Sequence, residues 1–350
     1  TAFWTALFIW FWNMIIGMTI CWFYGKGKAI RKGFLAVVLL SVIQGGGELL
    51  LTQVNTTIAC FVPACISLIA ILLLGRLPAF RKEWSVEDSR VMERGKDTQE
   101  TEEKPEGMTL LHAFVPYILL SVIALVVLLV EPVHTLLSKV QIGFSFPETV
   151  TGYGYVNEAV ESFSPWTPFT HASMFLFVSA VIGMIYYKKK GWIQKGGIGR
   201  IFVRAVSMTM PSGMAIIGLV IMSKIMAGTG QTEVLANGIA GVLGKVYVIL
   251  SPFIGLLGSF MTGSNMSSNI LFAGFQSTTA NLLNVDPSIV LGAQSSGGSI
   301  GSAISPSNIV LGTTTANILG SEGKVLRKII VITVPAALMI GVFVLALTSL

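Results

Sequence analysis

The chain has 350 residues, of which 53% are hydrophobic and 11% are charged, and its mean hydropathy is +0.76. Soluble domains carry about 25% charged residues, so this composition excludes a soluble domain and indicates an integral membrane protein. The formal net charge of +6 comes from basic residues that are divided among several loops, which gives no basis for nucleic-acid binding.

Apolar stretches predict most of the membrane spans, since a spanning helix needs about 20 largely apolar residues. Single spans are predicted at residues 3–23, 113–130, 173–187, 205–227 and 329–347. Residues 33–74 are too many for one helix, and polar residues near 45–55 predict two helices that meet there. A shorter apolar segment at 246–261 contains Pro252. We therefore predict an all-α fold, a polytopic transmembrane helix bundle that forms a single domain over residues 1–350.

Basic loops indicate how the spans cross the membrane. Of the 23 lysines and arginines, 20 lie at residues 25–33, 75–112, 188–204 and 321–328. Because cytoplasmic loops are enriched in Lys and Arg, we predict a multi-pass protein of the plasma membrane with these four loops in the cytoplasm. The 75–112 loop mixes seven basic and nine acidic residues, which is typical of a solvated connector. Residues 131–170 are predicted to face outside, and the start within a span at Thr1 predicts an N-terminally incomplete chain.

Residues 262–317 are polar although their neighbours are apolar: 32 of these 56 residues are Ser, Thr, Asn, Gln or Gly, and Asp286 is the only charged one. The densest clusters are 262–269 and 297–308. Residues 270–283 and 288–293 have partial helical character, whereas the glycines, the proline and the clustered hydroxyls at 262–269 and 294–308 predict irregular structure. Helix-breaking polar backbone at membrane depth is tolerated only where it is buried in protein or lines a water-filled cavity. The stretch therefore predicts re-entrant or discontinuous helices in a substrate-binding hairpin unit at residues 246–320. Asp286 precedes a proline, so we predict that it caps a helix.

Such a unit suits a small monoanion. Helices that end inside the membrane leave free N–H groups and a partial positive charge at their N-termini, which attract anions. Neutral hydroxyls and amides contribute about 0.5–1.5 kcal/mol per hydrogen bond, so several of them sum to a weak, reversible affinity. Isolated small residues at helical spacing are interpreted as packing positions instead. The predicted substrate contacts are Ser264, Asn265, Ser268, Asn269, Ser305, Ser307 and Asn308, with Gln276 and Gln294 in support.

Ionisable residues elsewhere supply one further candidate. Glu48 follows three glycines between two predicted spans. It is a proton-coupling candidate if it lies within the membrane, and a position at the outer surface fits the sequence equally well. The histidines have no second ligand at i+4 and the cysteines have no paired spacing, so we predict neither a metal nor a cofactor. Since no HExxH motif is present either, we predict that the protein is not an enzyme.

Several segments carry a resemblance to a known family. They are residues 251–272, Gln276, 293–301, 304–306 and 322–327, in this order and spacing. These segments resemble the L-lactate permease family, most strongly over about residues 205–328, and the chain looks like the C-terminal two-thirds of such a permease. The resemblance implies uptake of lactate and of glycolate, a related 2-hydroxy acid, by proton symport across the cell membrane. It also implies kinship with the ion transporter superfamily, in which Ser264-Asn265 would form a re-entrant hairpin tip and residues 305–308 a facing broken helix.

The resemblance leaves alternatives open. Many lactate permeases carry a small residue followed by Lys after the Ser-Pro pair, whereas this chain has Ser307-Asn308. The absence of this cation leaves open which substrate is carried and which ion its transport is coupled to. A sodium-coupled carboxylate or inorganic anion carrier is one alternative, and a truncated membrane sensor without transport activity is another. We expect alternating access by displacement of the 246–320 unit against the other helices. Lactate, protons and the lipid bilayer are the expected partners, and a homodimer is left open.

Overall fold

A computed structural model describes residues 1–56, 58–81, 107–152, 154–193, 196–316, 318 and 320–349. The chain forms two compact units, one made of Thr1–Thr98 with Ile216–Leu350 and the other of Gln99–Ala215. Residues 82–106 lie outside the described residues. The predictions for the loop at 75–112 therefore fall mostly outside them too.

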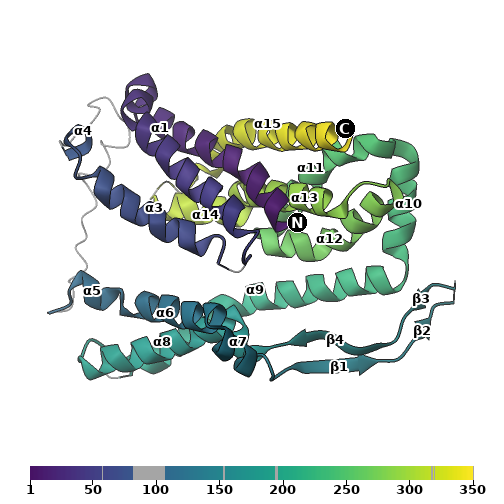
Figure 1. The fold of residues 1–350 in the computed structure, drawn as a ribbon, viewed down its shortest axis with the longest axis horizontal. Coiled ribbons are helices and arrows are strands. Elements are labelled where there is room, and N and C mark those ends of the chain that lie inside the picture. Colours follow the sequence, from purple (N-terminus) through teal and green to yellow (C-terminus); the bar gives the residue numbers. More distant parts are fainter. Residues whose placement is uncertain are drawn as a thin grey trace. The chain divides into compact units, whose positions relative to one another are not determined.

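The helices of the first unit come from both ends of the chain (Figure 1). The N-terminal part supplies α1 (Ala2–Ser41), η1 (Val42–Gly46), α2 (Gly47–Leu51), α3 (Phe61–Leu74) and α4 (Pro78–Arg81). The C-terminal part supplies the end of α9 (Gly197–Gly228), then α10 (Gln231–Leu243), η4 (Gly244–Val246), α11 (Tyr247–Thr262), α12 (Asn265–Leu282), α13 (Pro287–Gly301), η5 (Ser302–Ile304), α14 (Pro306–Thr315) and α15 (Glu322–Ser349). Helices α11, α12 and α13 pack on one another, with α1 and α15 against them. The sequence patterns did not predict α10.

Helix α1 is a helical hairpin rather than one straight helix. Its backbone leaves the helical region at Gly25 (φ −159°) and Lys26 (φ 50°). The two limbs then run antiparallel and pack closely. A Cβ placed on Gly17 in the first limb would lie only 2.6 Å from a methyl group of Val37 in the second limb. The first limb corresponds to the predicted span at 3–23. The second limb continues through η1 into α2, which ends at the predicted polar interruption before α3 begins.

The second unit combines helices with a small β-ribbon. Its helices are α5 (Leu110–Ala113), α6 (Val115–Leu129), α7 (Glu131–Leu137), η3 (Pro168–Thr170), α8 (Ala172–Lys189) and the start of α9. Helix α7 is bent by 89° from α6. The strands form two antiparallel pairs, β1 (Ile142–Phe146) with β4 (Val160–Trp166) and β2 (Thr149–Val150) with β3 (Val156–Asn157). These strands were not predicted from the sequence, but the predicted helical fold class is confirmed.

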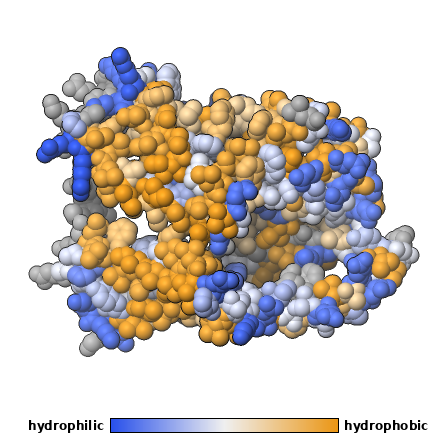
Figure 2. Space-filling model, in the orientation of Figure 1, coloured by the Kyte–Doolittle hydropathy of each residue, from blue (hydrophilic) through white to orange (hydrophobic). Residues whose placement is uncertain are grey.

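The outer surface of the first unit is that of a membrane protein. Large apolar side chains on its helices are more than 60% exposed, among them Ile20, Leu68, Leu72 and Val331. Figure 2 shows hydrophobic residues gathered over the N-terminal hairpin and α3. In the described part of the chain, four helical segments are long and apolar enough to cross a membrane, or five with the bent α6–α7 pair. The protein is therefore a helical polytopic membrane protein.

Candidate functional site

The first polar cluster forms the tip of a helical hairpin between α11 and α12. Gly263 ends α11 in the left-handed conformation (φ 74°), which a glycine adopts without steric cost. Ser264 is extended, and its Oγ accepts a hydrogen bond from the backbone N–H of Ser267 at 3.3 Å, so it caps α12. Thr262 Oγ1 donates to the carbonyl of Gly258 at 2.8 Å. The predicted irregular segment at 262–269 is thus much shorter than expected, because helical structure resumes at Asn265.

The second polar cluster contains a break between α13 and α14. The carboxylate of Asp286 accepts a hydrogen bond from the N–H of Ser288 at 2.8 Å, which confirms the predicted cap of α13. The helix ends at Gly301, a 3-10 turn follows, and Ser305 is extended (ψ 140°) before Pro306 opens α14. A residue before proline is disfavoured in the helical region. We expected irregular structure over 294–308, but the first half of that range is helical.

Glycines explain why α13 stays helical through this range. A Cβ on Gly297 would overlap the carbonyl oxygen of Pro252, and one on Gly301 would overlap that of Leu256. On the facing helix, a Cβ on Gly255 would overlap the α13 backbone. The glycines therefore let α11 and α13 approach backbone to backbone, as small residues do at helix interfaces in membranes.

The hairpin tip and the helix break lie together. Asn308 Nδ2 donates to the carbonyl of Ser302 at 2.8 Å and to the carbonyl of Gly263 at 3.3 Å. A Cβ on Gly263 would overlap the Ser307 hydroxyl, which lies 3.4 Å from the hydroxyl of Ser305. The two polar clusters, about forty residues apart in sequence, thus share one junction. Ser305 is fully buried there, whereas Ser307 and Asn308 are exposed.

Beneath the tip, α12 and α13 are joined by a ladder of side-chain hydrogen bonds. Asn265 Nδ2 donates to Ser299 Oγ at 2.9 Å, and Asn269 Nδ2 donates to Ser295 Oγ at 3.2 Å. The two asparagines are four residues apart on α12, and the two serines are four apart on α13, so each pair shares a helix face. Neither serine was predicted as a site residue from the sequence, although this spacing was a usable signal. Ser299 also sits in a Gly-x-Ser-x-Gly spacing, but inside a helix rather than at a strand-to-helix nucleophile elbow.

Buried residues of the same region support the ladder. Ser268 Oγ donates to the carbonyl of Gly255 at 2.9 Å. The amide nitrogen of Gln294 lies 3.4 Å from both the Ser268 carbonyl and Asn269 Oδ1. Both side chains are fully buried, so they position α12 against α11 and α13.

Three buried oxygens in this region have no hydrogen-bond partner among the described residues: Ser259 Oγ, Asn265 Oδ1 and Gln294 Oε1. A buried acceptor left without a donor costs about 1–3 kcal/mol. Asn265 Oδ1 lies over Gly298, where an added Cβ would overlap it and would also come within 3.1 Å of Ser259 Oγ. The helix interface therefore holds acceptors that an incoming hydroxyl or N–H group could satisfy.

Two predicted residues lie away from the junction. The amide of Gln276 is fully buried, where its Oε1 accepts from the Tyr247 hydroxyl and its Nε2 donates to the Ser251 carbonyl. Glu48 lies on α2, and its Oε1 accepts a hydrogen bond from Cys60 Sγ at 3.2 Å. Both are held by protein groups outside the two polar clusters.

Comparison with known proteins decides the family. A family model described as L-lactate permease matches residues 1–350. The chain belongs to the L-lactate permease family. This confirms the predicted family, and because its named members are permeases, it agrees with the prediction that the chain is not an enzyme.

Relatives within the L-lactate permease family include the glycolate permease GlcA of Escherichia coli K12, which is 32% identical over 179 residues, 51% of this chain and 31% of that protein. The L-lactate permease of Bacillus subtilis 168 is 31% identical over 129 residues, 37% of this chain and 23% of that protein. The L-lactate permease of Escherichia coli K12 is 36% identical over 99 residues, 28% of this chain and 18% of that protein. The matched stretches thus span less than a third of each relative's length. No solved structure matches the chain significantly.

Proposed function

We propose that the junction of α11–α12 with α13–α14 binds a small 2-hydroxy monocarboxylate, lactate or glycolate, which the protein carries by secondary active transport. The observation that carries the proposal is the meeting of the hairpin tip with the helix break through Asn308. The names of the relatives, a glycolate permease and L-lactate permeases, support the substrate class.

The chemistry of the junction fits a monoanion with a hydroxyl group. Helices α12 and α14 both begin there, and helix N-termini carry N–H groups and a partial positive charge that favour a carboxylate. The hydroxyls of Ser264 and Ser307 are neutral donors, so the carboxylate is held without a fixed cation. A substrate hydroxyl that enters as the tip moves would give Asn265 Oδ1 the donor it lacks.

This arrangement predicts discrimination between lactate and propanoate, which lacks the hydroxyl. Satisfying one buried acceptor is worth about 1–3 kcal/mol, or about a 5- to 150-fold difference in affinity. Gln294, buried behind the tip, acts as a positioning residue in this proposal, and Gln276 supports α12 farther from the tip by its contacts with α11.

Coupling to protons and alternating access complete the proposal. The α11–α14 region would move against a scaffold formed by the other helices, as in transporters with discontinuous helices. Glu48 remains the proton-coupling candidate because it is an acidic residue on a predicted membrane-spanning segment. A sodium-coupled carboxylate carrier and a non-transporting sensor are the rivals.

Uptake into proteoliposomes tests the proposal. Lactate uptake should follow an imposed proton gradient, and the Asn265→Ala variant should lose most of the preference for lactate over propanoate. Asn308→Ala should lower uptake of both substrates. Asn281→Ala is the matched control, since this exposed asparagine lies near the far end of α12, and it should behave like the parent.

Each rival has its own outcome. Uptake stimulated by a sodium gradient alone would overturn proton coupling and leave the site intact. Lactate binding without flux would favour the sensor. Parent-like uptake and preference in Asn265→Ala and Asn308→Ala, both inserted normally, would show that the junction is not the substrate site.

A further inference from the structure

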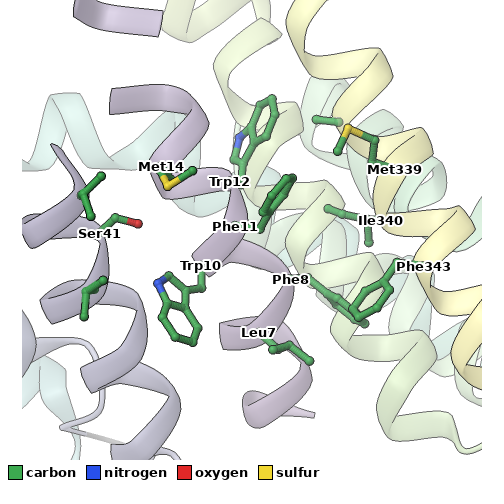
Figure 3. A pocket seen from close by; sticks show the side chains of 13 residues that line it. Leu7, Phe8, Trp10, Phe11, Trp12, Met14, Ser41, Met339, Ile340 and Phe343 are labelled. Carbon is green, nitrogen blue, oxygen red and sulfur yellow. The ribbon is translucent and has the colours of Figure 1, made fainter. Parts of the chain in front are cut away.

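A long apolar groove runs along α1 and α15 in the first unit. Its first part is a cavity of about 570 Å³ between the two limbs of α1 and α15 (Figure 3). Trp10, Phe11, Met14, Met339 and Phe343 are among its lining residues. No charged residue and none of the polar residues of the α11–α14 junction lines it in the described part of the chain.

The groove continues toward the turn of α1. A second hollow of about 710 Å³ shares Met14 with the first and extends past Trp22 to Arg327 and Lys328. The lining from Arg327 to Phe343 covers 16 residue steps of α15, or about 24 Å at the helical rise. One leaflet of the hydrocarbon core is about 15 Å deep, so the groove is long enough for an acyl chain.

The charges of the groove lie at one end only. Arg327 and Lys328 are exposed there, and no acidic residue lines either part among the described residues. Ile30 lines the same end, which brings the basic turn of α1 at 25–33 close to the start of α15. Trp22 has the amphipathic ring that is enriched at membrane–water interfaces. The groove is therefore cationic at its interfacial end and apolar beyond it.

We propose that this groove binds an anionic phospholipid, with an acyl chain along α1 and α15 and the phosphate at Arg327 and Lys328. The charge pattern selects this occupant. A neutral helix from another protein would use the apolar part and leave the two cations without a partner, whereas a free anion would use the cations alone. The proposal depends on the membrane location of the helices and not on the proposed transport function.

Bound lipid would link elements that the protein also joins by packing. The rings of Phe8 and Phe343, on α1 and α15, lie 5.8 Å apart in an edge-to-face arrangement. Both helices also pack against α13. An acyl chain in the groove adds contacts between the same two helices, so lipid binding should stabilise this part of the first unit.

Quenching of tryptophan fluorescence in detergent tests the proposal, because Trp10 and Trp22 line the groove. The probes are phosphatidylglycerol and phosphatidylcholine with the same brominated acyl chains. Each basic residue near a lipid surface contributes about a factor of five in affinity, so phosphatidylglycerol should bind about 30-fold more tightly. The R327Q/K328Q variant should remove this preference, and K189Q/K190Q at the exposed end of α8 should retain it.

Other outcomes overturn the proposal. Equal quenching by both lipids would mean that the groove takes acyl chains without selecting an anionic headgroup. Protection against quenching by inorganic phosphate alone would mean a free-anion site. An undiminished preference in R327Q/K328Q would place the lipid elsewhere. If that variant does not fold, melting of the parent protein decides, since only phosphatidylglycerol should raise its apparent melting temperature strongly.

Discussion

Substitution of Gly297 by alanine should destabilise the α11–α13 interface. The added Cβ would overlap the carbonyl oxygen of Pro252, and backbone cannot rotate away as a side chain can. Overpacking of this kind costs about 1–3 kcal/mol. Replacing a helical glycine by alanine gains up to about 1 kcal/mol of helix propensity, so the net change at Gly297 should be a loss of about 0–2 kcal/mol.

Gly274 on α12 is the matched control for this substitution. It is also a helical glycine, but nothing lies within 4 Å of a Cβ placed on it among the described residues. Gly274→Ala should therefore show only the propensity gain, about 1 kcal/mol of stabilisation at most. The two variants should differ by about 1–3 kcal/mol in the free energy of unfolding.

Thermal unfolding of the purified variants in one detergent measures this difference. Because each kcal/mol shifts a melting temperature by a few degrees at most in chains of this size, Gly297→Ala should melt at least a degree or so below Gly274→Ala. Equal melting temperatures would show that α11 and α13 are not in backbone contact at this position, and the proposed arrangement of the tip above them would then lose its support.

Substitutions at two further positions test structural roles. Tyr247→Phe removes the donor to Gln276 Oε1 and leaves a buried acceptor without a partner. This should cost about 1–3 kcal/mol of stability in the same melting experiment. The relative uptake of lactate and propanoate should stay unchanged. Asp286→Ala removes the cap of α13 and should cost about 0.5–2 kcal/mol, whereas Asp286→Asn should retain most of the stability because asparagine caps equally well. A loss in Asp286→Asn as large as in Asp286→Ala would indicate a role for the charge rather than for the cap.

The sequence predicted where helices break in this region, because helix-breaking polar residues are a local signal. The cluster at 262–269 contains the end of α11 at Gly263 and the new N-cap at Ser264. The cluster at 297–308 contains the break before α14, which begins at Pro306. The cap at Asp286 rests on the same kind of signal.

The parts that were wrong or missed depend on long-range contacts. Glycine-rich sequence has low helix propensity, so residues 294–301 appeared irregular, but contact with the α11 backbone keeps them helical. The partners of Gln276, the Tyr247 hydroxyl and the Ser251 carbonyl, were missed because they lie on the neighbouring helix α11. In the β-ribbon of the second unit, β1 pairs with β4 in an irregular register, which no local sequence pattern predicts.

The contrast between the two kinds of contact indicates where the proposed site would open. α11 and α13 meet through glycines at backbone distance, and such interlocked surfaces resist sliding. The tip and the break, in contrast, are linked by the Asn308 amide and by small hydroxyl groups, with 3.3 Å between Asn308 Nδ2 and the Gly263 carbonyl. Neutral hydrogen bonds of this kind are worth only about 0.5–1.5 kcal/mol each, so separating the tip from the break costs less than separating α11 from α13. We therefore expect substrate to enter at the tip while the helices behind it stay together, and the lower uptake expected of Asn308→Ala should come with little loss in the stability of the fold.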